Sequence, residues 1–459
     1  MKILGDRAVV LGGSIAGLLA ARVLADAYGE VVVVERDELP DGPAHRQGVP
    51  QGRHIHALLA RGHSALEELF EGLTAELAAD GAPAGDMLGD TRLYFNGHRY
   101  RPAPSGLPML CASRPMLEAS IRTRVRALPG VTVLDRCDVS GLVASPGGGT
   151  VTGARVLRRI DGAAEEIIPA DLVVDATGRA SRTPLWLDAL GHPRPPVDEV
   201  RIGVCYTSRT YRPDSGVLNG DLAVIMGATP EHPRGGALLA TEGGEFLLTL
   251  YGVLGDRPAT DPEGFDGFAA GLRFPDLHRV MLGSEPLTDA VSFRFPASVR
   301  HRYERLPRLP DGLLVIGDAV CAFNPVYGQG MSVAALEALA LRRHLGRGTA
   351  PRPTRFQRDI GRIIDPAWTT STQADLAYQD TRRPAPSRLI ERYIDRIHAG
   401  ATRDPDLGRA FLRVAGLIDP PPALMRPSTA TRVLRHALRR GPAGDEKAES
   451  SLVPPKGSS

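Results

Sequence analysis

Residues 7–37 read RAVVLGGSIAGLLAARVLADAYGEVVVVERD, and this stretch decides the fold of the chain. Residues 8–11 form a short apolar run of the kind found in buried parallel strands. Gly12, Ser14 and Gly17 follow it at the spacing of a dinucleotide-binding fingerprint, with Ser14 where a second glycine is usual. The pattern provides a tight turn at the first glycine and a close helix–strand contact at the last one.

The rest of the stretch completes a strand–helix–strand unit. A helix is predicted to run to about Tyr28 and to end at Gly29, and residues 31–34 are predicted to form the second strand. Glu35 then stands about twenty residues past the glycines, where a carboxylate can accept hydrogen bonds from ribose hydroxyls. The helix N-terminus offers free N–H groups and a positive dipole end to a pyrophosphate. We therefore predict a dinucleotide site formed by Gly12, Ser14, Ile15, Ala16, Gly17, Glu35 and Arg36.

Two other interpretations of the glycine motif exist. A glycine-rich turn between a strand and a helix can occur without a ligand, but Glu35 at the expected distance argues against it. Residues 12–16 also resemble a degenerate nucleophile elbow, with Ser14 as the attacking group. Such an elbow normally follows several strands of a sheet, and no predicted strand precedes this one.

Length and composition are those of an ordinary globular protein. The 459 residues suffice for two or three domains, and the hydrophobic share of 42% and charged share of 24% are typical. A net charge of +2 gives no reason to expect a nucleic-acid partner. The first strand begins too early for a signal peptide to precede it, and no run approaches the roughly twenty apolar residues of a membrane helix. Four scattered cysteines without a CxxC pair predict neither a disulfide framework nor a zinc site, so we expect a cytoplasmic enzyme.

Residues 46–56, RQGVPQGRHIH, carry two histidines in an extended segment. His54 and His56 could share one face and bind a metal ion. No third ligand stands nearby in the sequence, so no metal site is predicted. Hydrogen-bonded histidines beside a cofactor are the better interpretation.

Residues 201–300 differ from the rest of the chain because most of their apolar residues do not follow helical periodicity. Their apolar runs predict the strands of a sheet. Val291, Phe293 and Phe295 alternate with polar residues and therefore share one face of a strand. These three residues are either simple core residues or, together with Tyr206, the lining of a substrate pocket roofed by the sheet.

Three separated stretches occur in the order used by one known family. They are the opening unit, GRASR at 178–182 after an apolar strand, and GDAVCAFNPVYGQGMS at 317–332. Together they resemble the FAD-dependent aromatic-hydroxylase superfamily, of which para-hydroxybenzoate hydroxylase is the type. Within it, the 317–332 stretch and RQGVPQGRHIHAL at 46–58 look closest to squalene-epoxidase-like enzymes of polyether antibiotic pathways, of the lasalocid and monensin type. The resemblance covers roughly residues 5–375.

The resemblance implies a noncovalently bound FAD and assigns roles to residues. Asp318 would accept from a ribityl hydroxyl, and Arg114 would reach the ribose or the pyrophosphate. The helix that follows residues 328–330 would point its N-terminus at the pyrimidine edge of the flavin, where reduction places negative charge. Besides the opening unit, the implied cofactor-binding residues are Arg46, Arg114, Gly178, Asp318, Pro325, Gly328, Gln329, Gly330 and Met331. The residues expected near the reacting atoms, and hence the candidate catalytic residues, are Arg46, Gln51, Pro325 and Gly328.

The predicted fold class is α/β: a Rossmann-type FAD-binding domain with an inserted mixed β-sheet substrate domain and a C-terminal helical region. An Asn96-Gly97 turn predicts a hairpin at the start of the substrate domain. In the C-terminal region a basic helix is expected to be packed by Val433, Leu434 and Leu438. The expected segments are 1–90, 108–200 and 301–350 for the discontinuous FAD-binding domain, 91–107 and 201–300 for the substrate domain, 351–440 for the helical region, and 441–459 for a disordered tail.

The resemblance implies a monooxygenase, an epoxidase or hydroxylase, that acts on a large apolar natural-product intermediate such as a polyketide. Thr177 stands where the hydroxylases carry an Asp before Gly178, so direct reduction by NADPH is in doubt and a separate flavin reductase is expected as a partner. Halogenation is disfavoured because Trp186 and Trp368 stand alone, whereas relatives that halogenate tryptophan carry a Trp-rich motif. The alternative is an FAD-binding cyclase in antibiotic biosynthesis that forms decalin rings by 4+2 cycloaddition and uses FAD structurally. The motifs do not separate the two activities.

Overall fold

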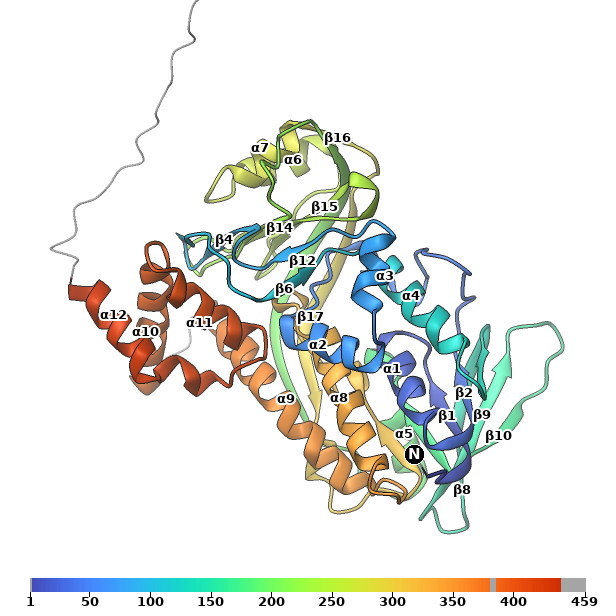
Figure 1. Cartoon of the computed structure of the whole chain (residues 1–459). Helices are drawn as coiled ribbons and strands as arrows, with labels where there is room; N and C mark the ends of the chain where they lie inside the picture. Colours follow the sequence, from blue (N-terminus) through green and yellow to red (C-terminus); the bar gives the residue numbers. More distant parts are fainter. Residues whose placement is uncertain (1, 380–384, 439–459) are drawn as a thin grey trace, which may run out of the picture.

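A parallel sheet forms the base of the molecule (Figure 1). The computed structural model describes residues 2–379 and 385–438, and within them this sheet has five strands in the order β18-β11-β1-β2-β7. Val9 at its centre pairs with Val32 on one side and Val173 on the other, and all three side chains are buried. The strands span Leu313–Val315 (β18), Leu172–Asp175 (β11), Gly5–Leu11 (β1), Tyr28–Val34 (β2) and Val131–Leu134 (β7).

The opening strand–helix–strand unit forms as predicted, except at the end of its helix. Helix α1 spans Ile15–Leu24 and stops four residues before Tyr28. Gly29 lies inside β2 and does not end the helix, so that expectation is wrong. Strand β1 begins at Gly5 and pairs with β2 from Tyr28 onward. This pairing places Tyr28, which was expected at the end of the helix, in the strand. The tertiary ladder therefore overrides the local pattern.

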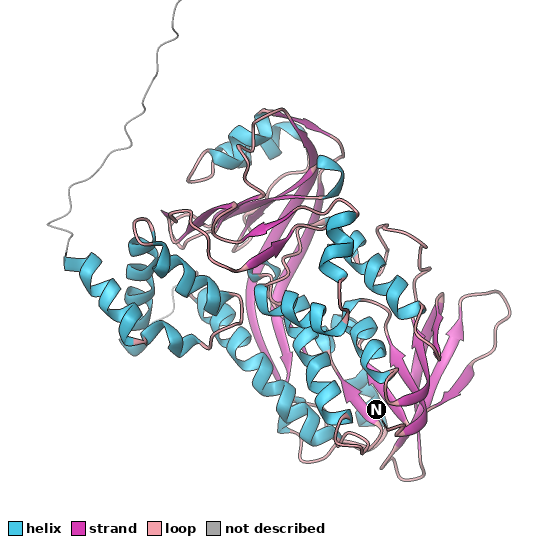
Figure 2. Ribbon diagram, in the orientation of Figure 1, coloured by secondary structure: helices cyan, strands magenta, loops and turns pink. Residues whose placement is uncertain are grey.

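A second, larger sheet stands above the first and contains nine strands within the described residues (Figures 1 and 2). Its longest strands are an antiparallel pair, β12 (Val197–Pro213) and β17 (Val291–His301). The Asn96-Gly97 turn, with both residues at positive φ, joins the edge strand β5 to its neighbour β4 as predicted. The other strands are β19 (Cys321–Ala322), β15 (Phe246–Gly252), β14 (Arg234–Ala240), β13 (Ala223–Met226), β4 (Thr91–Phe95), β5 (His98–Arg99) and β16 (Ser284–Pro286).

The larger sheet extends past the limits expected for an inserted domain. Strand β12 starts at Val197, before residue 201, and β19 adds residues 321–322 from the segment expected to bind FAD. Two short helices, α6 (Pro262–Ala270) and α7 (Asp276–Leu282), cover one region of this sheet, and the second of them was not predicted. The division into domains stays a prediction.

Helices and small sheets surround the parallel sheet. Helix α1 packs between α4 (Arg114–Arg126) and α8 (Gly330–Leu345), and α8 also packs on α9 (Pro353–Leu376). Further elements are α2 (Ala60–Leu69), α3 (Leu73–Ala79), β3 (Ala84–Asp86), β6 (Pro108–Leu110), β8 (Cys137–Ala144), β9 (Val151–Arg158), β10 (Glu166–Pro169) and α5 (Thr183–Ala189). Among the described residues, none of the helices combines the length and apolarity needed to cross a bilayer.

The C-terminal helices gather at one end of the molecule, shown in red in Figure 1. They are α10 (Ala385–Ala401), α11 (Pro405–Ala415) and α12 (Pro427–Leu438). In the last of these Val433 is 2% exposed, but Leu434 and Leu438 are 58% and 84% exposed. The expectation that all three side chains pack is therefore wrong for the two leucines. The tail predicted at 441–459 lies outside the described residues.

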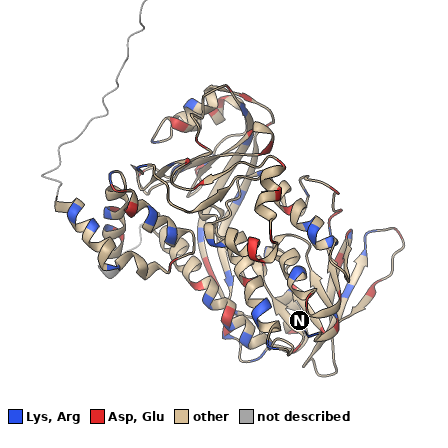
Figure 3. Cartoon of the chain, viewed as in Figure 1, with Lys and Arg blue, Asp and Glu red and all other residues tan. Residues whose placement is uncertain are grey.

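Acidic and basic residues are interspersed over the described part of the chain (Figure 3).

Gly17 provides a direct test of this packing. A Cβ atom at Gly17 would overlap the carbonyl oxygen of Gly12, whereas a Cβ at Gly42 would meet nothing within 4 Å. We expect Gly17→Ala to destabilise the protein by about 1–3 kcal/mol, because the helix must move away from the strand. Gly42→Ala is the matched control and should unfold like the wild type. Equal urea midpoints for the two variants would contradict the close contact.

Candidate functional site

The turn between β1 and α1 leaves the start of the helix without a cap. Gly12 has a φ of +102°, and a Cβ there would meet the carbonyl oxygen of Ala176 at 2.5 Å. Ser14 is the N-cap residue, but its hydroxyl donates to Glu118 at 2.9 Å instead of capping the first turn. The N–H groups of that turn therefore remain available to a ligand.

Glu35 stands at the end of β2 and faces this turn. Its side chain is buried, and one carboxylate oxygen accepts from the N–H of Gly13 at 2.7 Å. The other oxygen accepts from the N–H of Asp37 at 3.0 Å. This carboxylate is held where the sequence predicted it, beside the glycine turn, whereas Arg36 is exposed.

A buried network of charges closes the same end of the site. Glu118, on α4, accepts from Arg46 Nε at 2.8 Å and from Arg114 Nη2 at 2.9 Å. Arg114 also donates to Ser14 Oγ at 2.8 Å, and Arg46 donates to Asp37 at 3.2 Å. Burial alone would raise the pKa of the Glu118 carboxyl, but the two guanidinium groups outweigh burial and hold it below its ordinary value.

This network decides where Arg46 lies. Its guanidinium is 3.6 Å from Glu35 and is buried among acids, so it stands at the glycine turn. In the described part of the chain, no hydrogen bond or ion pair joins it to residues 324–331. Arg46 therefore lies at the glycine turn, and its predicted places near the cofactor and the reacting atoms stay predictions.

Asp318 lies between the N-termini of two helices. The carboxylate is exposed although Gly317 and Ala319 on either side are buried. A Cβ at Gly317 would meet Ala16 of α1 at 2.8 Å, and one at Gly330 of α8 would lie 3.8 Å from Asp318 Oδ1. Although Asp318 keeps solvent-accessible surface, the atoms packed around its carboxyl reduce its hydration and raise its pKa, and Arg179 and Arg114 oppose that rise. The structure thus brings Asp318 to the opening unit and to the start of α8 at once.

Glu337 holds the Asp318 turn through a hydrogen bond to its backbone. This residue of α8 is 1% exposed, and its Oε2 accepts from the N–H of Gly317 at 2.6 Å. Burial raises the pKa of Glu337 to about 8, and the nearby Asp318 adds to the rise. At neutral pH the side chain is therefore mostly a neutral acid. Sequence analysis missed it because α8 reads as an ordinary buried helix.

The loop before α8 is clamped on both sides. Gly328 has a φ of +64°, and a Cβ there would meet Ala57 at 2.7 Å. On the other side Asn324 Nδ2 and Tyr327 Oη each donate to Asp375 Oδ1 at 2.8 Å. Burial raises the pKa of Asp375, a residue of α9, to about 6. Of the predicted residues in this loop, Pro325 is exposed, Gln329 and Met331 are buried, and Gly330 begins the helix.

His54 and His56 are hydrogen-bonded, as the sequence interpretation expected. His54 Nδ1 lies 2.7 Å from Ser208 Oγ, and His56 Nδ1 donates to the carbonyl oxygen of His54 at 3.0 Å. Burial, assisted by the guanidinium groups of nearby arginines, lowers the pKa of His54 to about 4 and that of His56 to about 3. Both rings are therefore neutral at physiological pH. No cluster of three metal-binding side chains occurs among the residues that the structure describes. Gln51, a predicted catalytic residue, lies just before His54 in the 3-10 turn Pro50–Arg53 and is half-buried.

The four residues predicted to line a substrate pocket do share one face of the larger sheet. Tyr206 stands directly opposite Phe293 on the neighbouring strand, with ring centroids 5.4 Å apart. Tyr206 and Phe295 are buried in a small core, whereas Val291 and Phe293 keep part of their surface exposed. Tyr206 and Phe295 are thus core residues. The prediction that this face lines a substrate pocket stays a prediction.

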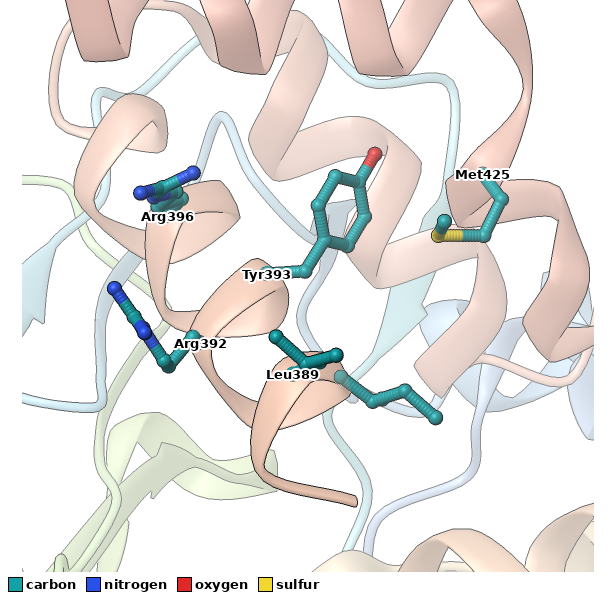
Figure 4. Close-up of a pocket in the computed structure, with 6 residues that line it drawn as sticks. Leu389, Arg392, Tyr393, Arg396 and Met425 are labelled. Carbon is teal, nitrogen blue, oxygen red and sulfur yellow. The ribbon is translucent and has the colours of Figure 1, made fainter. Parts of the chain in front are cut away.

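An apolar groove opens elsewhere, on the C-terminal helices (Figure 4). It has a volume of about 410 Å³ and contains none of the predicted site residues. Its lining residues are Leu389, Ile390, Arg392, Tyr393, Arg396 and Met425.

Comparison with solved structures defines the class of fold. The chain superposes on flavin-dependent brominase Bmp2 with a TM-score of 0.63 at 15% identity, covering 94% of this chain and 100% of that one. It superposes on p-nitrophenol 4-monooxygenase PnpA from Pseudomonas putida with a TM-score of 0.62 at 17% identity, covering 90% of this chain and 98% of that one. The chain therefore shares its fold with a flavin-dependent brominase and with a p-nitrophenol monooxygenase.

Sequence comparison places the chain in a family. It is 36% identical over 468 aligned positions to protein Rv3254 of Mycobacterium tuberculosis, covering 95% of this chain and 94% of that protein, and it belongs to the same family. A more distant relative is kynurenine 3-monooxygenase of Salinispora tropica, 28% identical over 372 positions, covering 73% of this chain and 72% of that enzyme. No protein-family model matches the chain.

Glu337 provides a test of how the Asp318 turn is held. The folded state keeps this carboxyl protonated up to about pH 8, whereas the unfolded chain releases the proton near the ordinary pKa of 4.5. The wild type should therefore lose stability between these two values as pH rises, and Glu337→Gln should not share that loss. Glu337→Leu leaves the Gly317 N–H unpaired, so we expect it to be less stable than Glu337→Gln by about 1–3 kcal/mol.

The measurement is urea unfolding of the three proteins at about pH 5 and about pH 8.5. The difference between Glu337→Gln and the wild type should grow in favour of the variant at the higher pH. Parallel pH profiles for these two proteins would contradict a neutral Glu337.

Proposed function

We propose that the chain is an FAD-dependent monooxygenase, an epoxidase or hydroxylase, that acts on a large apolar natural-product intermediate such as a polyketide. One observation carries the proposal. Three segments far apart in sequence converge on one place: the glycine turn with Glu35, the Asp318 turn, and the Gly328–Gly330 loop at the start of α8. Each segment presents a group suited to a different part of FAD.

The residues present fit FAD along its length. Glu35 suits the ribose hydroxyls, and the uncapped start of α1 with Ser14 and Arg114 suits the pyrophosphate. Asp318 suits the ribityl chain, since its carboxylate keeps exposed surface between two helix N-termini. FAD held in this way would supply, after reduction, the activation of dioxygen and the transfer of one oxygen atom.

The remaining work of the chain is positioning. The N-terminus of α8 directs a positive dipole end toward the loop where the flavin edge is proposed to lie, and Asp375 fixes that loop through Asn324 and Tyr327. His54 and His56 stay neutral and add no charge. The apolar face around Phe293 would keep water away from the reacting atoms.

The other activities considered have weaker support. No observation favours the cyclase, since none of the relatives or structures compared here is named as one. The brominase shares the fold at 15% identity, which supports the fold and not its reaction. The kynurenine 3-monooxygenase relative covers 73% of the chain and agrees with oxygen transfer. We also propose that the chain is divided into a discontinuous FAD-binding domain and an inserted β-sheet domain, as the sequence predicts.

The experiment supplies FAD-loaded protein with labelled dioxygen, NADPH and a flavin reductase, together with a panel of polyenes and fused-ring phenols. We expect one labelled oxygen atom in the product, read by mass spectrometry. The same mixture without the reductase should give little product, because Thr177 replaces the acid associated with pyridine nucleotide. An unlabelled product isomeric with its substrate, formed without oxygen or reductant, would contradict the monooxygenase and support the cyclase.

A further inference from the structure

Arg179 is held against the aromatic face of the larger sheet. It belongs to the short turn Gly178–Ala180 that follows β11. Its guanidinium carbon lies 5.7 Å from the ring centroid of Phe293 and 5.3 Å from that of Phe295. Cation–π attraction at these distances favours this position of the guanidinium without using its N–H groups.

The N–H donors of Arg179 are unused. Within residues 2–379 and 385–438 it makes no ion pair and donates no hydrogen bond, and its side chain is exposed. Arg46 and Arg114, in contrast, are tied to Glu118. An arginine that is fixed by two rings but lacks an acceptor has its planar set of donors ready for a ligand.

The position of Arg179 connects the two halves of the site. Its charge acts on the carboxyl of Asp318, where it opposes the rise in pKa caused by burial. It also acts on Tyr206, where burial raises the pKa of the hydroxyl and the guanidinium opposes that rise. Yet Arg179 is not within ion-pair distance of Asp318. The turn that carries Arg179 packs against the Asp318 turn, and the guanidinium lies over Phe293, so Arg179 stands between that turn and the face formed by Tyr206 and Phe293.

We propose that Arg179 binds an acidic oxygen group of the substrate, a carboxylate or an enolate, while the apolar body of the substrate lies against Phe293. This inference rests on the proposed function, because it concerns the same substrate site. A guanidinium matches two oxygen atoms of an acid in one plane, and this pairing strengthens where water is excluded. The substrate class is thereby narrowed from large apolar compounds to large apolar acids.

The test uses 2-naphthoate and 2-naphthamide as probes, which differ in charge but hardly in shape. Their dissociation constants are read from the change in flavin absorbance of the FAD-loaded protein. We expect the wild type to bind the acid about tenfold or more tightly than the amide, and Arg179→Met to lose this preference. Arg179→Lys should keep part of it, because a lysine retains the charge but not the planar donors.

Arg182 provides the matched control. It lies in the same segment, and its guanidinium carbon stands 6.0 Å from the ring centroid of Trp186. Arg182→Met should keep the preference for the acid, and both methionine variants should retain FAD.

The outcomes separate the possible roles of Arg179. An unchanged preference for the acid in Arg179→Met would overturn the proposal, and weaker FAD retention in that variant would assign this arginine to the cofactor instead. A wild type that binds both probes equally, or neither, would also overturn it. Protein that takes up no FAD at all would defeat the proposed function instead, so the two failures are distinguishable.

Discussion

The contact between Gly17 and Gly12 is the constraint on which the rest of the structure depends. It lets α1 lie directly on the ends of β1 and β11, with no room for a side chain between them. Because α1 sits so close, Ala16 at its start meets the Asp318 turn, and the parallel strands deliver Glu35 and Asp175 to the same edge of the sheet. The candidate site is thus a consequence of one backbone contact at the carboxyl edge of a parallel sheet.

Charge is handled in two different ways around this edge. Near the glycine turn, arginines and acids neutralise one another in a buried network centred on Glu118. Burying such charges is costly unless each finds partners, so the network fixes the positions of Arg46 and Arg114. Beneath the Asp318 turn, Glu337 avoids the cost by staying protonated. Arg179 is neither paired with an acid nor neutral: it lies against two aromatic rings, and within the described residues its N–H groups donate to no protein acceptor.

Local patterns in the sequence predicted the parts of the fold that depend on neighbouring residues. The β1–α1–β2 unit and the Asn96-Gly97 hairpin form as expected, because a glycine turn and a two-residue loop are specified within a few positions. The end of α1 was wrong because β2 extends to pair with all of β1. The full length of β12 was also missed, since partners far away in sequence set how long a strand runs.

The candidate site was predicted to a similar extent and for similar reasons. Glu35 and Asp318 follow strands in motifs, so their positions could be inferred. Glu337 and Asp375 act only through partners 20 to 51 residues away, and no periodicity marks them. Glu118 had a local signal, its place four residues after Arg114 on one helix, that could have been noticed.

The most direct test of the central claim is the identity of any flavin that the purified protein holds. The account predicts a yellow protein that releases intact FAD, and not FMN, when it is denatured. Glu35→Ala should weaken FAD retention by about 1–3 kcal/mol, because a buried ribose hydroxyl would lose its acceptor. A colourless protein whose absorbance and stability are unchanged by added FAD would contradict the account.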